Sequence, residues 1–83
     1  MFYVYFLKLS NGDIYKGMTA DLKIRISDHK LGKAESTKNY CPLRFIGYEA
    51  YQLKSDAGSR ERFLKTTEGR KLLMRQYRDV ISS

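Results

Sequence analysis

Residues 15–29, YKGMTADLKIRISDH, decide the expected fold of this chain. The first three have the composition of a strand end, and the next two turn the chain into a helix. In that helix Arg25 and His29 lie four residues apart, so their side chains project from one face, one turn apart. The hydroxyl of Tyr15, a guanidinium and an imidazole are therefore expected at one edge of a small domain, and this combination suggests chemistry on a phosphate.

Before this stretch the sequence predicts a β-hairpin. Aromatic and branched residues fill positions 2–9, which indicates a buried strand. Residues 10–13 (SNGD) contain an Asn-Gly pair, the strongest short signal for a two-residue hairpin turn. Residues 13–18 are then the returning antiparallel strand, which places Tyr5 and Tyr15 on neighbouring strands.

After the turn, the stretch continues into a helix that is expected over Ala20–Leu31. Thr19 is the predicted N-cap, because its hydroxyl can accept a hydrogen bond from the first turn. Leu22 and Ile26 form an apolar pair at helical spacing, and Gly32 is a natural stop. Helix signals are thus present at both ends.

An exposed loop is expected at residues 33–42, which lack periodicity and end at the single proline. The predicted elements after it are a strand over 43–51, a helix from Ser55 or Asp56 to about Lys65, and a helix over 67–79 with fraying at Ser82 and Ser83. The order is strand, strand, helix, strand, helix, helix. A small three-stranded antiparallel sheet flanked by helices is the simplest way to bury these apolar stripes, so the fold class is α+β.

Composition limits the size of the protein and suggests its partner. The chain has 83 residues, enough for one domain spanning 1–83, and it carries 16 Lys and Arg against 9 Asp and Glu, a net charge of +7. So basic a balance favours a polyanionic partner, most often nucleic acid. The alternative is a soluble basic protein that has no such partner.

Other classes of protein are excluded by residue types. With one cysteine, Cys41, and one histidine, the chain can form neither an internal disulfide nor a Cys/His zinc site. The opening MFYVYFLKL is apolar for only about seven residues, and it lacks the basic start and the small-residue cleavage site of a signal peptide. It is therefore expected to be neither a signal peptide nor a membrane span. We therefore expect a cytoplasmic protein in a reducing compartment, without membrane contact.

Several short motifs follow one another along the chain. They are YVY at 3–5, YKG at 15–17, T-x-D-L-x-x-R-x-x-x-H at 19–29, Thr37-Lys38, and A-x-x-x-E-x-x-x-K at 57–65. In this order and spacing they resemble the GIY-YIG nuclease superfamily. The resemblance is to its small stand-alone members, which are close in pattern to the amino-terminal nuclease domain of the bacterial excision-repair nuclease, the excinuclease.

The chain departs from the pattern of this superfamily in several places. Tyr3 and Val4 replace a glycine and an isoleucine in the first motif, and Lys16 replaces an isoleucine in the second. Many members also have an asparagine about a dozen residues after the glutamate, where this chain has the apolar run 72–74. The missing asparagine bears on substrate positioning more than on the chemistry.

The resemblance implies a metal-dependent endonuclease that hydrolyses DNA phosphodiester bonds. Glu61 matches the metal-binding glutamate, and a lone carboxylate with waters and phosphate oxygens can hold Mg²⁺ or Mn²⁺. Arg25 would contact the scissile phosphate with its permanently charged fork. Tyr15 or His29 would activate the attacking water, and the sequence does not separate the two. Tyr5 would orient the same water.

Basic residues outside these motifs are candidates for contacts with the phosphate backbone. They are Lys33, Lys38, Lys65, Arg70, Lys71 and Arg75. The alternative is that they form a solvated helix surface. The expected activity is structure-selective or low in sequence specificity, in DNA repair or recombination, with a protein partner possible and RNA not excluded as substrate. The competing hypothesis is a catalytically weak or inactive adaptor that uses a nuclease fold to bind nucleic acid.

Overall fold

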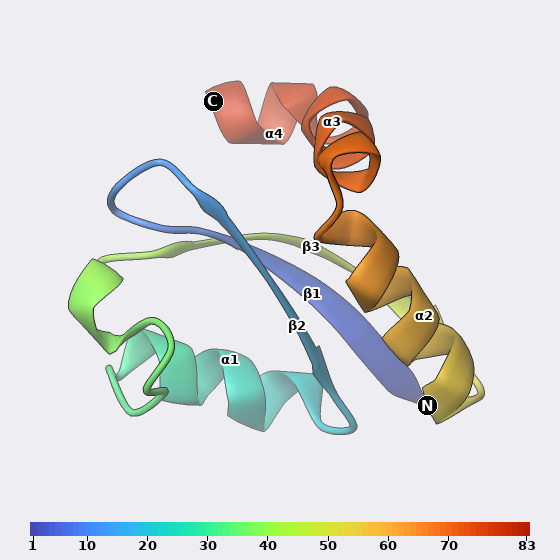
Figure 1. The fold of residues 1–83 in the computed structure, drawn as a ribbon. Helices are drawn as coiled ribbons and strands as arrows, with labels where there is room; N and C mark the ends of the chain where they lie inside the picture. The colour runs from blue at the N-terminus through green and yellow to red at the C-terminus, as the bar shows by residue number, and fades with distance from the viewer.

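The computed structural model describes residues 1–83 and confirms the α+β architecture. Its elements are β1 (Phe2–Lys8), β2 (Ile14–Thr19), α1 (Leu22–Lys30), a short 3-10 helix (Lys38–Tyr40), β3 (Arg44–Tyr51), α2 (Lys54–Leu64), α3 (Thr67–Gln76) and α4 (Arg78–Ser82). The three strands form one antiparallel sheet in the order β2-β1-β3. Figure 1 shows α1 on one side of this sheet, and α2, α3 and α4 on the other.

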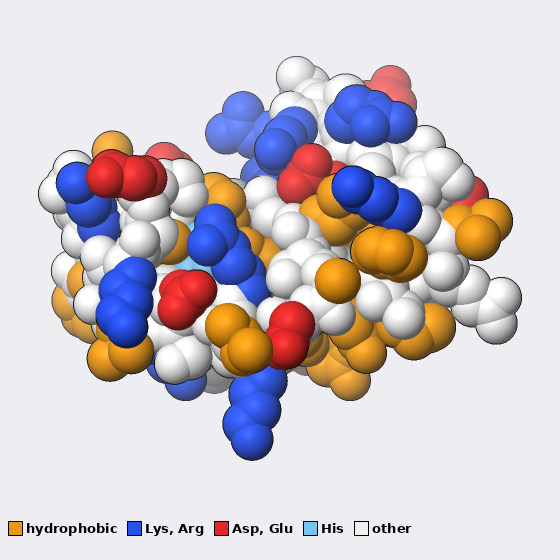
Figure 2. All heavy atoms as spheres, turned by 90° about the horizontal axis from the view of Figure 1, so that it is seen from below, with side chains coloured by type: hydrophobic (Ala, Val, Ile, Leu, Met, Phe, Trp, Pro, Cys, Tyr) orange, Lys and Arg blue, Asp and Glu red, His pale blue; other side chains and the backbone are white.

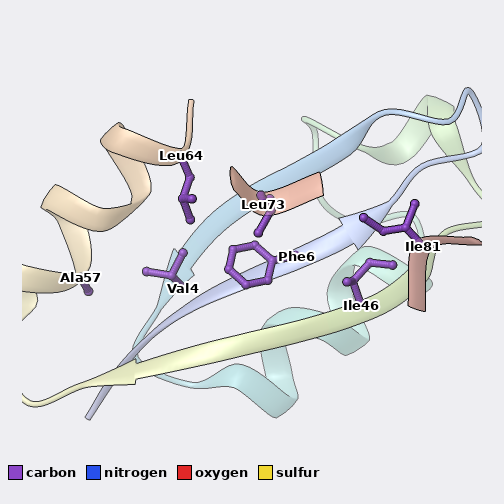
Figure 3. Close-up of a cluster of buried hydrophobic side chains, with 7 residues drawn as sticks. All are labelled: Val4, Phe6, Ile46, Ala57, Leu64, Leu73 and Ile81. Carbon is purple, nitrogen blue, oxygen red and sulfur yellow. The ribbon is translucent and has the colours of Figure 1, made fainter. Parts of the chain in front are cut away.

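The apolar core lies on the side of the sheet that faces α2, α3 and α4. Because successive side chains of a strand point to opposite faces, Val4 and Phe6 of β1 share this face, and both are fully buried. They pack with residues from the third strand and from all three helices, as Figure 3 shows: Ile46, Ala57, Leu64, Leu73 and Ile81. The core thus holds the three carboxyl-terminal helices against the sheet and leaves the other face of β1 to α1.

The hairpin between β1 and β2 is longer than the predicted two-residue turn. The backbone N–H of Leu9 donates to Asp13 O at 2.9 Å, and that of Gly12 donates to Leu9 O at 3.0 Å. Gly12 has φ +92° while Asn11 has no positive φ, so the Asn-Gly pair does not form a turn that needs two such residues. The pairing places Tyr5 opposite Gly17 and Tyr15 opposite Leu7.

The first helix is capped differently from the prediction. The Asp21 carboxylate accepts a hydrogen bond from Ile24 N at 3.1 Å and is the N-cap, so the assignment of this role to Thr19 was wrong. The Thr19 hydroxyl instead accepts from Asp21 N at 3.1 Å and holds the turn before the cap. The predicted stop is confirmed, since Gly32 has φ +73° and Lys33 N donates back to Asp28 O at 2.9 Å.

Later elements also differ from the prediction at their boundaries. The second helix begins at Lys54, where Leu53 caps it without a side-chain hydrogen bond, rather than at Ser55 or Asp56. The predicted final helix is divided at Tyr77 into α3 and α4, and Ser82 belongs to α4 instead of fraying. Leu73 of α3 and Ile81 of α4 both reach the core.

Segment 33–42 is only partly the exposed loop that was expected. It contains the 3-10 helix at Lys38–Tyr40, and two of its residues, Ala34 and Thr37, are buried. Thr37 is buried because its hydroxyl bonds to a buried side chain of α1. Polarity alone suggested exposure, whereas a satisfied polar group can lie inside the protein.

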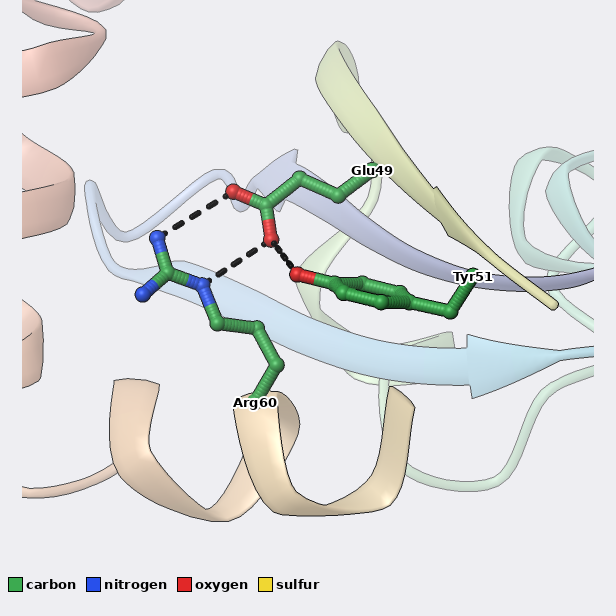
Figure 4. A network of polar contacts seen from close by, with 3 residues as sticks. All are labelled: Glu49, Tyr51 and Arg60. Atoms are coloured by element: carbon green, nitrogen blue, oxygen red, sulfur yellow. Dashed lines mark hydrogen bonds and ion pairs between the residues drawn. The ribbon is translucent and has the colours of Figure 1, made fainter. Parts of the chain in front are cut away.

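Two sets of polar contacts fix the helices on β3 and β1. Arg60 of α2 donates to both carboxylate oxygens of Glu49, at 3.0 and 3.3 Å, and Tyr51 donates to the same carboxylate at 2.7 Å (Figure 4). At the other end, Lys8 Nζ donates to the carbonyl of Ile81 in α4 at 2.9 Å. The Glu49 carboxylate is therefore used in holding α2 in place.

No helix in the structure combines the length and the apolar character that crossing a membrane requires.

Candidate active site

Side chains from β1 and α1 meet at the hydroxyl of Tyr5, on the face of the sheet opposite the apolar core. Arg25 Nε donates to this oxygen at 3.3 Å, and His29 Nε2 lies 2.8 Å from it. Arg25 and His29 are one helical turn apart on α1, as their spacing predicted. The structure thus brings three of the predicted site residues into direct hydrogen-bonding contact.

His29 is enclosed on all sides and both of its ring nitrogens have partners. Its exposed fraction is 0%, and its Nδ1 lies 2.6 Å from the hydroxyl of Thr37. Burial lowers the pKa of His29, and the positive charge of Arg25 lowers it further. The imidazole is therefore neutral near pH 7, with one nitrogen donating and the other accepting.

Tyr5 is held in place by the residue opposite it as well as by its hydrogen bonds. Its ring lies across Gly17, and a Cβ at that position would overlap the ring carbons and the hydroxyl. Burial raises the pKa of Tyr5 to about 12, against the lowering effect of the hydrogen bond from Arg25. Tyr5 is therefore a protonated phenol at neutral pH, and glycine in the second motif is needed for close packing.

Tyr15 stands beside this group without a hydrogen bond to it. Its ring centroid lies 5.2 Å from that of His29 and 6.2 Å from that of Tyr5. Its hydroxyl accepts a hydrogen bond from Ser36 at 3.2 Å, and the residue is only half-buried. Tyr5, Tyr15, Arg25 and His29, called the tyrosine cluster below, thus present one partly open hydroxyl and one guanidinium.

Glu61 makes no hydrogen bond or ion pair with the tyrosine cluster. It is on α2, with 21% of its side chain exposed, and its one ion pair is with Lys65 at 3.6 Å. Nowhere in the structure do three or more His, Cys, Asp or Glu side chains gather into a metal-binding group. A single half-buried carboxylate is still compatible with Mg²⁺, which keeps several waters and completes its shell with phosphate oxygens.

The predicted nucleic-acid-binding residues fall into separate groups. Lys33 and Lys38 are in the segment after α1, where Lys38 pairs with Glu35 at 3.0 Å. The remaining four, Lys65, Arg70, Lys71 and Arg75, lie at the end of α2 and along α3. Figure 2 shows Lys and Arg atoms distributed over the face seen from below, with acidic atoms between them. Basic side chains are thus spread over several elements.

Three residues of the site were not among the predicted ones. Thr37 holds the second nitrogen of His29, and Ser36 donates to the hydroxyl of Tyr15. The Thr37-Lys38 pair in the sequence was a usable signal for the first. Lys16 lies on β2 and shares a small pocket with Tyr15, and no local pattern indicates this because the other walls come from distant residues.

Comparisons with known proteins identify relatives of this chain in sequence and in fold. A UPF0213 protein of Staphylococcus aureus is 36% identical over 72 residues, which cover 86% of this chain and 88% of that protein. One from Cupriavidus pinatubonensis is 41% identical over 56 residues, or 66% of this chain, and the match spans less than two thirds of that protein, 62%. The solution NMR structure of a UPF0213 protein from Bacillus halodurans has a TM-score of 0.59 and 31% identity, covering 92% of this chain and 85% of that one.

A family comparison covers nearly the whole length. Residues 1–76 match the GIY-YIG catalytic domain, a range that contains the tyrosine cluster, Glu61 and all three strands. The resemblance found in the sequence is confirmed, and so is the fold. The superfamily is one of nucleases that generally depend on a divalent metal ion. This chain belongs to the GIY-YIG catalytic domain family.

Proposed function

We propose that residues 1–83 act as one nuclease domain, a metal-dependent endonuclease that hydrolyses phosphodiester bonds of DNA. The observation that carries the proposal is the meeting of Arg25 and His29 at the hydroxyl of Tyr5, with Tyr15 beside them. This arrangement places a permanent positive charge and a half-buried hydroxyl next to each other. Phosphodiester hydrolysis needs both a stabilised phosphate oxygen and an oriented water.

Arg25 is the proposed contact to the scissile phosphate. Its Nε is used by Tyr5, which leaves the two terminal nitrogens free to donate. The hydrogen bond with Tyr5 raises the pKa of Arg25, so the guanidinium stays charged. Tyr5 therefore orients Arg25 and keeps the fork pointed in one direction while the phosphate is bound.

Tyr15 is the proposed residue that positions the attacking water, in preference to His29. His29 has no exposed surface, and both of its nitrogens are occupied by Tyr5 and Thr37. Tyr15 is half-buried, and its hydroxyl is bonded only to the exposed Ser36. His29 is thus assigned to supporting the two tyrosines from inside the protein.

Glu61 is the proposed ligand for the metal ion, Mg²⁺ or Mn²⁺. When bound, the ion would supply positive charge to the phosphate and lower the pKa of a bound water. Lys65, the C-cap of α2 and one turn after Glu61, pairs with Glu61 and helps to orient its carboxylate. The identity of the ion is part of the proposal.

The proposed substrate is a DNA structure rather than a sequence. Basic residues spread over several elements favour contacts with the phosphate backbone, which carry little sequence information. We place the activity in the cytoplasm, in repair or recombination, with a protein partner adding selectivity. RNA is an alternative substrate to be tested alongside DNA.

A second candidate function is supported by the lack of a hydrogen bond or ion pair between Glu61 and the tyrosine cluster. Because no contact joins this residue to the tyrosine cluster, the chain could bind nucleic acid without cutting it. In this case the basic residues would act in an adaptor and the metal would have no role. Cleavage assays separate the two functions directly.

The test is cleavage of a labelled panel of supercoiled plasmid, nicked duplex, flap, four-way junction, single strand and RNA, with Mg²⁺ or Mn²⁺. Glu61→Gln and Arg25→Met are each expected to reduce the rate at least about 100-fold, the usual effect of losing one charge-stabilising group. Arg62→Met is the matched control, because Arg62 is an exposed arginine of α2 whose side chain hydrogen-bonds only to Ser59. Unchanged cleavage by folded Glu61→Gln protein would refute the metal role, and salt-dependent binding without any cleavage would establish the adaptor.

A further inference from the structure

A small pocket opens at the free edge of β2, the outer strand of the sheet. Its volume is about 280 Å³. Three consecutive residues of β2 line one side of it, Ile14, Tyr15 and Lys16. Two basic residues from the carboxyl-terminal helical region, Lys65 and Arg70, line the other. The pocket lies between β2 and the junction of α2 with α3, so it is formed only when the helices pack on the sheet.

The three basic side chains of the pocket are close together and poorly neutralised. Lys16 and Arg70 form no hydrogen bond or ion pair through their side chains, and Lys65 has only the 3.6 Å contact with Glu61. Burial lowers the pKa of Lys16, the charges of Arg70 and Lys65 lower it further, and Asp13 opposes them. Holding three cations together is unfavourable unless an anion is bound among them.

The position of the pocket relates it to the proposed nuclease site. Tyr15 lines it and also lies beside His29 in the tyrosine cluster, with the two rings tilted and their centroids 5.2 Å apart. On the opposite wall, Lys65 pairs with Glu61, the proposed metal ligand. The pocket therefore adjoins both the tyrosine cluster and Glu61, which no direct contact connects.

We propose that this pocket binds one phosphate group of a nucleic acid, next to the phosphate that is cleaved, with Lys16, Lys65 and Arg70 as donors. The neighbouring position rests on the proposed function, whereas the binding of phosphate does not. The volume of the pocket is large enough for a single phosphate group and its water, and its three charges suit phosphate better than a carboxylate. Binding there fixes the backbone between Tyr15 and Glu61.

The phosphate could come from two sources, an internal diester of the strand or a monoester at its end. Both present oxygen acceptors to the same three donors. A diester carries one negative charge, while a terminal monoester carries nearly two near pH 7. The experiment below distinguishes the two.

The test is an NMR titration of the whole protein in EDTA, where no cleavage occurs. The probes are inorganic phosphate, a short DNA strand without a terminal phosphate, and the same strand with a 5′-phosphate. We expect backbone shifts centred on residues 15–17, 65 and 70, together with a rise in the pKa of Lys16, because a bound anion favours the charged ammonium. Equal shifts from the two strands identify the diester, and stronger shifts from the phosphorylated strand identify the monoester.

Substitutions then distinguish binding of phosphate in this pocket from non-specific attraction to the positive charge of the whole protein. Lys16→Met and Arg70→Gln are each expected to weaken phosphate binding about tenfold, the effect of one charge-assisted hydrogen bond. Lys54→Met is the matched control, because it removes the same charge at the opposite end of α2. It should leave the affinity within about twofold.

The proposal is overturned if phosphate shifts are scattered over all basic residues, or if Lys54→Met weakens binding as much as Lys16→Met. Because the titration needs neither metal nor cleavage, its outcome is independent of the nuclease activity. Phosphate binding without cleavage would refute only the proposed nuclease function. Cleavage without phosphate binding at Lys16 would refute only the proposed phosphate pocket.

Discussion

The two faces of β1 differ in chemistry although one strand forms both. Val4 and Phe6 enter an apolar core shared with α2, α3 and α4. Tyr5, between them in sequence, points the other way and shares hydrogen bonds with Arg25 and His29 of α1. Neighbouring positions on this strand are therefore subject to different constraints, packing volume on one face and hydrogen-bond geometry on the other. The comparison predicts that substitutions on the two faces should have different consequences.

The largest effect is expected on the apolar face. Phe6 is fully buried between the sheet and the carboxyl-terminal helices, so Phe6→Ala should lower the free energy of unfolding by about 3–5 kcal/mol. Urea unfolding followed by circular dichroism measures this. Met74→Ala, at a side chain that is 47% exposed, is the control and should cost much less. Similar losses for the two variants would mean that the core is not where the structure places it.

A smaller effect is expected on the polar face. Tyr5→Phe keeps the ring but leaves the buried Nε2 of His29 without a partner, which should cost about 1–3 kcal/mol. Tyr51→Phe is the matched control on β3, because Glu49 retains both contacts with Arg60 after the hydroxyl is lost. We expect about 0.5–1.5 kcal/mol there, measured by the same urea unfolding. Equal losses in the free energy of unfolding for the two variants would contradict the expected cost of leaving Nε2 of His29 without a hydrogen-bond partner.

The smallest effect is a dependence of stability on pH that belongs to the polar face. The folded state lowers the pKa of His29 below its ordinary 6.5, mainly through burial. As pH falls below about 6.5, the unfolded chain gains a proton that the folded chain does not, so the free energy of unfolding should decrease. Well above pH 6.5, where the imidazole is neutral in both states, this contribution is complete.

The chain has one histidine, which makes this prediction specific. Urea unfolding between pH 7.5 and 5.5 should show the decrease in the natural protein. In His29→Gln the slope over this range should disappear, whatever the overall stability of that variant. A slope that persists in the variant would assign the pH dependence to carboxylates instead.

The sequence predicted those parts of the fold that depend on local patterns. Aromatic and branched residues and an Asn-Gly pair located the hairpin, and the four-residue spacing of Arg25 and His29 placed both on one face of α1. The spacing could not show that Tyr5 would be the shared partner, because this depends on the register opposite Gly17. Boundaries failed where two residues competed for one role, as Thr19 and Asp21 did at the start of α1.

Contacts made by distant segments were the part that could not be predicted. Thr37 looked like a loop residue because its neighbours are polar, and only the packing of α1 encloses it beside His29. In the sequence, Lys16 was noted only as the residue that replaces an isoleucine in the second motif. Its part in the pocket depends on Lys65 and Arg70, which come about 50 residues later in the chain. Local patterns contain no information on such pairs.

The contact between Lys8 and Ile81 has a consequence for synthesis of the protein. β1 is made first, yet the residues that cover Phe6 include Leu73 and Ile81, and Lys8 Nζ bonds to the carbonyl of Ile81. The apolar face of this strand therefore stays uncovered on the ribosome until residues 73–81 have emerged. The core is therefore completed only after this segment is made, and until then β1 exposes apolar surface of the kind that makes incomplete chains prone to aggregation.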